Sequence, residues 1–517
     1  MLAATPFLQV YANWCLGRLE MVSAAAAQEA ELLRLVQRAR RTRFGCDHEF
    51  SEIRSVADFQ ARVPIRDYEA FWEEYWGDAF PRLVDCTWPG QIPYFARTSG
   101  TTTGVTKFVP VSQEMNWSNI QAGWLIIALH LRNRPMSQIL GGRFFMLGGS
   151  TDLKREAPGV FSGDLSGIEA NEIPWWGRPY AFPPLEVALL KDWEEKIDRL
   201  ARLSLREDIR VLGGVPSWLL IYFDKLAELR PELEPKIATH FPHLEMLIHG
   251  GVDFRPYARR FSELLEGSRA ELREVYPASE GFIAIADRGQ GEGLRLLTNN
   301  GIFFEFVPTS ELGSPAPSRH WVATIETGID YAVIVSTCAG AWAYVLGDTV
   351  RFVETDPPRL LITGRTTSVL SAFGEHLIVE EIEEAVATAA DRIELSVVDY
   401  SVTPEFPDVA GQAGRHRYFI EFAERRPNDE QIEDFAQALD QRLCVLNADY
   451  ADHRSGGIGL GPPMVMALEP GTFAGWMKRR GRLGGQNKVP RVMNKSELVA
   501  DLNGYMRDIS LGADNRG

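Results

Sequence analysis

Residues 95–107 read FARTSGTTTGVTK, and this stretch is the most informative part of the 517-residue chain. Small hydroxyl residues and glycines run through it to Lys107, after which the apolar segment 108–111 begins. Glycines let main-chain N–H groups approach an anion closely, the hydroxyls add donors, and the lysine adds a positive charge. We therefore predict a loop that binds an anion. A nucleotide phosphate is the anion that suits such a loop, which indicates an ATP-using enzyme.

This loop differs from a Walker phosphate-binding loop. That motif reads GxxxxGK[ST], whereas Lys107 stands three residues after Gly104 and is followed by Phe108. The same residues also suit a surface turn rich in serine and threonine, so the segment alone leaves both interpretations open.

Composition and length limit what kind of protein this is. The length allows about two to four domains, and a hydrophobic content of 45% supports a large core. A formal charge of −16 argues against non-specific binding to nucleic acid or to an anionic membrane. The five cysteines are scattered and form no CxxC pair, which indicates reduced thiols in the cytosol.

The apolar segments predict neither export nor membrane insertion. No basic leader precedes the first apolar residues, so we expect no signal peptide. The longest apolar runs, such as residues 124–129, are too short to span a bilayer. We expect a monomeric cytoplasmic protein that binds neither membranes nor nucleic acid.

The first two thirds of the chain predict an α/β fold. Helices are expected over 24–43, from Pro64 within 59–76, over 112–132 and over 192–203. Strands that lead through glycines toward helices are expected at 144–147, 209–212 and 244–248, with helices at 217–229 and 257–265. Such alternation is typical of parallel sheets flanked by helices.

After Gly301 the pattern becomes mainly β, and then a second domain begins. Strands are expected at 302–307, 321–326, 331–336 and 341–345. The later part predicts helices at 380–389 and 429–446 and strands at 396–400 and 418–422. We therefore predict a large domain over 1–365, with helix-flanked sheets and a barrel-like part. A small mobile α+β domain is expected over 366–517.

Two further segments of the large domain carry candidate ligand groups. Residues 275–281 read VYPASEG after a strand-like run, at a place where α/β proteins bind ligands. There Glu280 can hold Mg²⁺ and the Tyr276 ring can stack on a purine. Asp348 follows a glycine at a strand end, which suits hydrogen bonds to ribose hydroxyls. Taken singly, both segments also fit ordinary turns.

Two basic residues complete the set. Arg365 stands at the expected domain border, and an arginine there can donate two parallel hydrogen bonds to a ribose or a phosphate. Lys488 lies in the glycine-rich segment 484–491, GGQNKVPR, and can act as a mobile point charge. Each also fits a solvated surface charge.

In this order, the segments resemble those of the auxin-responsive acyl-acid amido synthetases, which belong to the adenylate-forming superfamily of luciferases and acyl-CoA synthetases. The resemblance covers about residues 59–491 and is strongest over 298–352. There, NGIFFEFVP at 300–308 looks like the family's FFEF-P strand, and ETGIDY at 326–331 and STCAG at 336–340 lead into its Y-x-x-G-D motif.

The resemblance implies roles for individual residues, with ATP and Mg²⁺ as cofactors and Glu280 as the metal ligand. It assigns catalysis to Lys488, Glu280 and Lys107. It assigns nucleotide contacts to Ser99, Gly100, Thr101, Thr102, Gly104, Gly250, Gly251, Tyr276, Ser279, Asp348 and Arg365.

Two positions depart from the family pattern. The first motif of the family has Gly-Glu-x-Lys where this chain has Val105, and the third has Tyr-Arg where this chain has Val345. Both changes remove a charge and put the nucleotide contacts or the choice of acid in doubt. The region 115–185 matches least, so the plant hormone substrates are not implied.

The resemblance implies adenylation of a small aromatic or apolar carboxylic acid, followed by acyl transfer to an amine, in particular an amino acid, as the second domain turns near Arg365. No Ser–His–Asp or Cys–His signature is apparent among the nine histidines. Two alternatives stay open: a ligase that uses coenzyme A or a carrier thiol, and a non-catalytic nucleotide-binding relative. The wall of the acid pocket is assigned to His130, Trp175, Trp176 and Arg178.

Overall fold

The computed structural model forms two compact units. The first comprises Met1–Val252 and Leu265–Ile362, and the second comprises Asp253–Leu264 and Thr363–Gly517. The chain is described except for residues 1–4, 100–105, 149–152, 191–192, 252–253, 255–256, 313, 367–369, 371–376, 378, 406–413, 424, 448–449, 452–453, 455–459, 483–487, 494–495 and 515–517. The second unit thus takes up a short segment that the sequence assigned to the large domain.

The N-terminal region is helical, and polar caps set where each helix begins. The helices are α1 (Thr5–Met21), α2 (Ala24–Ala39), α3 (Arg43–Asp47), α4 (Val56–Arg62) and α5 (Tyr68–Phe71), the last running into a π-helical turn over Trp72–Trp76. The expected helix over 24–43 is broken because Thr42 caps a new one by accepting from the Gly45 N–H. The helix expected from Pro64 was wrong: Asp67 caps α5 by accepting from the Ala70 N–H at 2.8 Å.

Twelve strands form one sheet in the first unit, in the order β13-β12-β14-β15-β16-β11-β10-β9-β8-β7-β3-β6. The neighbours at its β6 end are parallel: β6 (Ala181–Phe182), β3 (Arg143–Leu147), β7 (Ile209–Gly214), β8 (Met246–Gly250) and β9 (Glu271–Ala278). This confirms the parallel strands expected from the alternation of strands and helices.

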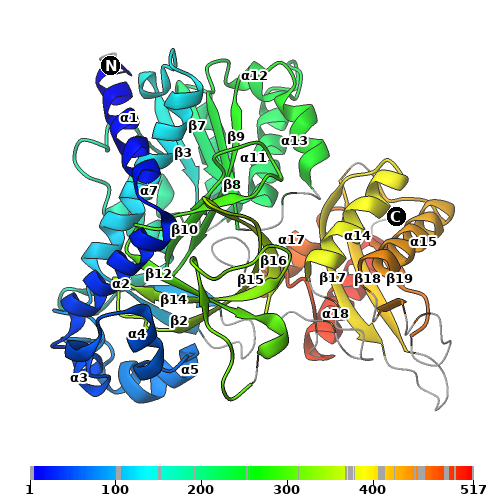
Figure 1. Ribbon diagram of the computed structural model, residues 1–517. Helices are drawn as coiled ribbons and strands as arrows, with labels where there is room; N and C mark the ends of the chain where they lie inside the picture. Colours follow the sequence, from blue (N-terminus) through cyan, green and yellow to red (C-terminus); the bar gives the residue numbers. More distant parts are fainter. Residues whose placement is uncertain are drawn as a thin grey trace. The chain divides into compact units, whose positions relative to one another are not determined.

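Helices pack beside these parallel strands. Helix α11 (Pro216–Leu229) contacts β7 and also α10 (Trp193–Ser204). Helix α7 (Gln113–Asn133) packs against α1, as Figure 1 shows. Helix α7 also contacts β10, which places this long helix next to the hairpin described below.

The other end of the sheet is antiparallel. Its strands are β10 (Gly281–Ile285), β11 (Leu294–Leu296), β12 (Ile302–Pro308), β13 (His320–Trp321), β14 (Asp330–Thr337), β15 (Tyr344–Thr355) and β16 (Pro358–Arg365). The strand expected over 321–326 was wrong, because the chain turns after Trp321, whose carbonyl accepts from the Thr324 N–H at 2.8 Å. The strand expected from residue 341 begins only at Tyr344, since Ala343 has a φ of 45°.

A smaller sheet contains the two strands on either side of the candidate phosphate loop. Its order is β2-β1-β5-β4, with β1 (Tyr94–Ser99), β2 (Thr106–Val111), β4 (Lys154–Ala157) and β5 (Val160–Gly163). Strands β1 and β2 are antiparallel, and Ser99 lies opposite Thr106. The candidate phosphate loop therefore joins the two strands of a hairpin.

The second unit is built on a three-stranded sheet of β17 (Val397–Glu405), β18 (Arg415–Phe422) and β19 (Met464–Leu468). Helices α14 (Val379–Arg392) and α15 (Asp429–Leu446) pack against each other, as expected for an α+β domain. Helices α17 (Thr472–Arg479) and α18 (Ser496–Asp514) were not expected from the sequence. None of the helices in the described ranges has the length and apolar character that a bilayer crossing requires.

Candidate functional site

Glu280 lies at the tip of the β9–β10 hairpin. Ser279 and Glu280 form a two-residue turn between the two strands, and Ala278 pairs with Gly281. Gly281 has a φ of 141°, and a Cβ there would lie 2.7 Å from Ile302 Cδ1 and 2.9 Å from Met115 Sδ. Only glycine fits this position, so the sequence around Glu280 is suited to presenting the carboxylate at the carboxyl end of a parallel strand.

Tyr344 lies beside Glu280 and donates a hydrogen bond to its carboxylate. The tyrosine is 3% exposed, and its ring lies 5.9 Å from that of Phe71 and 6.3 Å from that of Trp76. Burial, reinforced by the Glu280 charge, raises the pKa of Tyr344 well above its usual value. The phenol therefore stays protonated at neutral pH and remains a donor to Glu280.

The N-terminal helices bring a second group to the same neighbourhood. Arg66 pairs with the start of β15, because its carbonyl accepts from the Val345 N–H at 2.8 Å. Helix α5 follows directly, and Lys107 Nζ lies 3.3 Å from Glu69 Oε1 and 4.8 Å from the centre of the Tyr68 ring. The charge of Glu69 also contributes to the raised pKa of Tyr344. Glu280 and, through Glu69, Lys107 thus belong to the neighbourhood of Tyr344.

Tyr276 and Asp348 form a second polar contact. The Tyr276 hydroxyl donates to Asp348 Oδ2 at 2.6 Å. Their strands, β9 and β15, stand four steps apart in the sheet order, which in a flat sheet would separate them by about 19 Å. The sheet must therefore curl strongly here, in keeping with the barrel-like part that the sequence predicts. The hydroxyl fixes the carboxylate that was assigned to ribose.

The backbone structure requires glycine at both Gly250 and Gly251. Gly250 ends β8 beside Val275, and a Cβ on Gly250 would lie 2.2 Å from the Val275 carbonyl oxygen. Gly251 has a φ of 82°, which favours glycine. Both residues lie at the carboxyl end of a parallel strand, and their contact with adenine stays a prediction.

For several residues that the sequence assigns to the nucleotide site, the structure does not test the assigned role. Gly100, Thr101, Thr102 and Gly104 lie outside the described residues, and of Ser99 only the backbone pairing is described. Arg365 and Lys488 belong to the second unit, so their roles also stay predictions.

The second unit anchors the segment that carries Lys488. The Pro490 carbonyl accepts from Ser401 Oγ at 2.6 Å, and the Arg491 carbonyl accepts from the Val402 N–H at 2.9 Å. The Arg491 guanidinium donates to Asp399, to Glu383 Oε1 at 3.3 Å and to the Tyr257 hydroxyl at 3.2 Å. The sequence did not predict this largely buried network, because Arg491 stands in a basic, glycine-rich segment.

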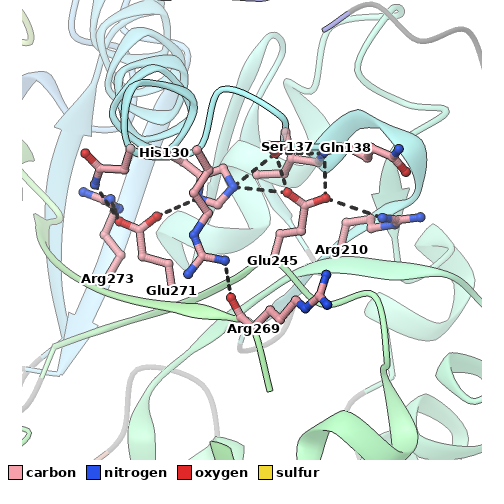
Figure 2. A network of polar contacts seen from close by, with 11 residues as sticks. His130, Ser137, Gln138, Arg210, Glu245, Arg269, Glu271 and Arg273 are labelled. Atoms are coloured by element: carbon pink, nitrogen blue, oxygen red, sulfur yellow. Dashed lines mark hydrogen bonds and ion pairs between the residues drawn. The ribbon is translucent and has the colours of Figure 1, made fainter. Parts of the chain in front are cut away.

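His130 does not line an acid pocket, which corrects the assignment made from the sequence. Figure 2 shows its imidazole between two carboxylates, with Nδ1 2.6 Å from Glu271 Oε2 and Nε2 3.3 Å from Glu245 Oε2. Glu271 begins β9 and Glu245 directly precedes β8, so the network lies at the opposite end of the strands from Glu280. The histidine, which is fully buried, ties α7 to the sheet.

Ser137 lies 3.2 Å from His130 Nε2, which superficially suggests a serine hydrolase. Its hydroxyl, however, donates to Glu245 and accepts from the Ile139 N–H at 3.1 Å. The serine is buried, so this is a structural network. Trp175 is 80% exposed and lines no enclosed wall, whereas Trp176 packs 5.4 Å from the Trp124 ring.

The chemistry of the donor set fits a nucleotide-bound Mg²⁺. Among the described residues, no group of three or more histidine, cysteine, aspartate or glutamate side chains could hold a metal ion. Magnesium in nucleotide sites is usually bound by one or two carboxylates together with substrate phosphates, so a single carboxylate such as Glu280 suffices.

Three models of the GH3 family match this chain. The N-terminal domain model matches residues 18–150, the central domain model 295–365 and the C-terminal domain model 380–497. Together these ranges cover more than half of the chain. The chain is 23% identical over 284 residues to an indole-3-acetic acid-amido synthetase, GH3.4, of Arabidopsis thaliana, covering 51% of this chain and 46% of that protein. The match thus spans about half the length of the curated relative.

Solved structures show the same fold. The acyl acid amido synthetase AtGH3.15, in complex with 2,4-DB, superposes with a TM-score of 0.80 at 18% identity and covers 96% of each chain. A 2-hydroxyisobutyryl-CoA ligase in the postadenylation state superposes with a TM-score of 0.62 at 15% identity, covering 94% of this chain and 92% of the ligase chain. The fold is thus that of adenylate-forming enzymes, with a large N-terminal and a smaller C-terminal domain.

Proposed function

The chain belongs to the GH3 family, and we propose that it is an ATP-dependent acyl-acid amido synthetase. Such an enzyme joins a carboxylic acid to AMP and then transfers the acyl group to an amine, here an amino acid. The observation that carries the proposal is the gathering of Lys107, Glu280 and Tyr344, which come from distant segments of the chain. The five free thiols suit the cytoplasm as its location.

In the first half-reaction, a carboxylate oxygen attacks the α-phosphorus of ATP while the bond to the bridging oxygen breaks and pyrophosphate leaves. Acid and triphosphate repel each other, so the protein must supply positive charge and alignment. Glu280 would hold Mg²⁺, which neutralises phosphate charge when bound. Tyr344 would keep the Glu280 carboxylate in place, because its hydrogen bond occupies one direction of that group.

Lys107 and Asp348 would bind the two ends of the nucleotide. The pair between Lys107 and Glu69 is weak, since Glu69 is 51% exposed, so a triphosphate can replace the carboxylate. Asp348 would accept hydrogen bonds from the ribose hydroxyls, with Tyr276 fixing its orientation. Lys488 would neutralise charge that develops on the α-phosphate.

In the second half-reaction, the amine nitrogen attacks the acyl carbon, AMP leaves with the C–O bond electrons, and the nitrogen gives up a proton. No covalent enzyme intermediate is required. A change in the orientation of the second unit would withdraw Lys488 and admit the amine, a known kind of gating motion.

The test is pyrophosphate release over a broad panel of acids with Mg·ATP, followed by product analysis with amino acids or with coenzyme A. Acid-dependent pyrophosphate release and an amide product are expected. A thioester product would assign the chain to the coenzyme A alternative, and no release with any acid would favour a non-catalytic relative.

Lys488→Ala tests the assigned catalytic lysine. Adenylation should fall by about 10²–10³-fold, because one preorganised charge is lost, while ATP affinity is mostly kept. Arg426→Ala, at an exposed pair with Glu469 in the same unit, is the matched control and should leave the rate unchanged. Unchanged pyrophosphate release by the Lys488 variant would remove this residue from the mechanism.

A further inference from the structure

Helix α7 buries two asparagine side chains whose amide groups are not fully hydrogen-bonded within the described residues. Asn116 is 3% exposed and Asn119 is 8% exposed. Within the described ranges, neither amide atom of Asn116 has a partner, and Asn119 Oδ1 has none either. Buried polar groups are almost always paired, because leaving water without a new partner carries a desolvation penalty. Three such atoms within one turn of a helix indicate a ligand that pairs with them.

A carboxylate stands next to these amides. Asn119 Nδ2 donates to Glu169 Oε1 at 3.2 Å, and Glu169 lies on helix α8 (Leu165–Asn171). The Glu169 side chain is accessible to solvent. The protein around it nevertheless raises the pKa of its carboxyl to about 7, through burial. The Glu169 carboxylate is thus within reach of a ligand beside the two amides.

Asn116 and Asn119 lie close to the proposed reaction centre. A Cβ on Gly281, the residue after Glu280, would lie 2.9 Å from Met115 Sδ, so Met115 touches the hairpin tip. Asn119 stands one helical turn beyond Met115 on the same side of α7, a rise of about 6 Å. That distance is about the length of an aromatic ring, so a small acid can reach both places.

We propose that Asn116, Asn119 and Glu169 bind the end of the acid that is remote from its carboxylate, and that this end carries a hydrogen-bond donor. A hydroxyl, an amino group or a ring N–H fits, because Glu169 and Asn119 Oδ1 both present acceptors. This inference rests on the proposed function and narrows its substrate class. The expected aromatic or apolar acid is thereby replaced by an acid with a polar far end.

The test uses pairs of acids that differ only in that far group. Each pair compares a hydroxyl- or amino-substituted acid with the acid that carries a methyl group at the same position. The pairs are drawn from benzoates, phenylacetates, cinnamates and straight-chain acids. With the wild-type chain, the best donor-bearing acid should exceed its methyl partner by about 10- to 100-fold in kcat/KM, as a hydrogen bond to a charged group supports.

Glu169→Leu and Asn119→Leu should abolish this preference or reverse it, while KM for ATP stays the same. Glu228→Gln is the control, since Glu228 is 67% exposed and paired with Lys225 on a different helix, α11. Thermal melts establish that each variant is folded, and Glu169→Gln, which keeps an acceptor oxygen, should retain part of the preference.

Two failures are distinguishable. If no acid supports pyrophosphate release, the proposed function itself is wrong. If methyl-bearing acids match or exceed their partners on the wild-type chain, or if the preference survives Glu169→Leu, the inference is overturned while the proposed function stands.

Discussion

Replacing Tyr276 with phenylalanine removes one hydroxyl and keeps the ring. The hydroxyl donates to Asp348 Oδ2 at 2.6 Å, and Tyr276 is 4% exposed. A hydrogen bond to a charged group contributes about 1.5–3 kcal/mol, and this one also orients the carboxylate assigned to ribose. We expect kcat/KM for ATP to fall by about 10- to 100-fold, since 1.4 kcal/mol corresponds to a factor of about ten.

The assay compares ATP with 2′-deoxyATP in acid-dependent pyrophosphate release. If Tyr276 acts by orienting Asp348 toward the ribose hydroxyls, the variant should lose much of its discrimination between the two nucleotides. Tyr331→Phe is the matched control: Tyr331 is fully buried in β14, and its hydroxyl accepts from the Glu326 N–H at 3.2 Å. An equal fall for both nucleotides would refute the orienting role, and an unchanged rate would refute the assignment of Asp348 to ribose.

Three further changes have defined outcomes. Glu69→Gln frees Lys107 from its 3.3 Å ion pair and should lower KM for ATP about two- to fivefold in steady-state kinetics, as expected for a weak exposed pair. Glu169 has its pKa raised to about 7 in the folded chain, so its contribution to stability is present below about pH 4.5 and is lost as the pH rises through 7. Glu169→Gln should flatten that part of the dependence of unfolding free energy on pH, and an unchanged profile would contradict it. His130→Ala should lower the free energy of unfolding by about 3 kcal/mol in denaturant titrations, because it leaves two partly buried carboxylates without the buried imidazole that they share, yet the activity per folded molecule should stay the same.

Much of the architecture could be predicted because it follows from local patterns. The alternation around 209–265 predicted parallel strands, and β7 and β8 are parallel neighbours. The helix expected over 429–446 matches α15, which Asn428 begins with a capping box. Hydrophobic periodicity and helix caps are read from a few consecutive residues, so such elements need no knowledge of the rest of the chain.

The errors have non-local causes. Proline often occupies the first position of a helix, which is why Pro64 was expected to start one. The backbone at Arg66 instead pairs with the start of β15, and α5 begins only at Tyr68. His130 was assigned to a pocket wall from its type alone, whereas Glu245 and Glu271 from the sheet hold it in a buried network. Neither the strand partner nor the two carboxylates can be read from the flanking residues.

By itself, the sequence determined the family, the order of helices and strands, and the residue types that a nucleotide site needs, because motifs and periodicity are properties of short segments. Only the tertiary structure decided that Tyr344 holds Glu280, that Glu69 pairs with Lys107 and that Tyr276 reaches Asp348. Those contacts depend on how far the twelve-stranded sheet curls and on where helix α5 packs. Both are set by packing among residues far apart in the chain, which no local pattern encodes.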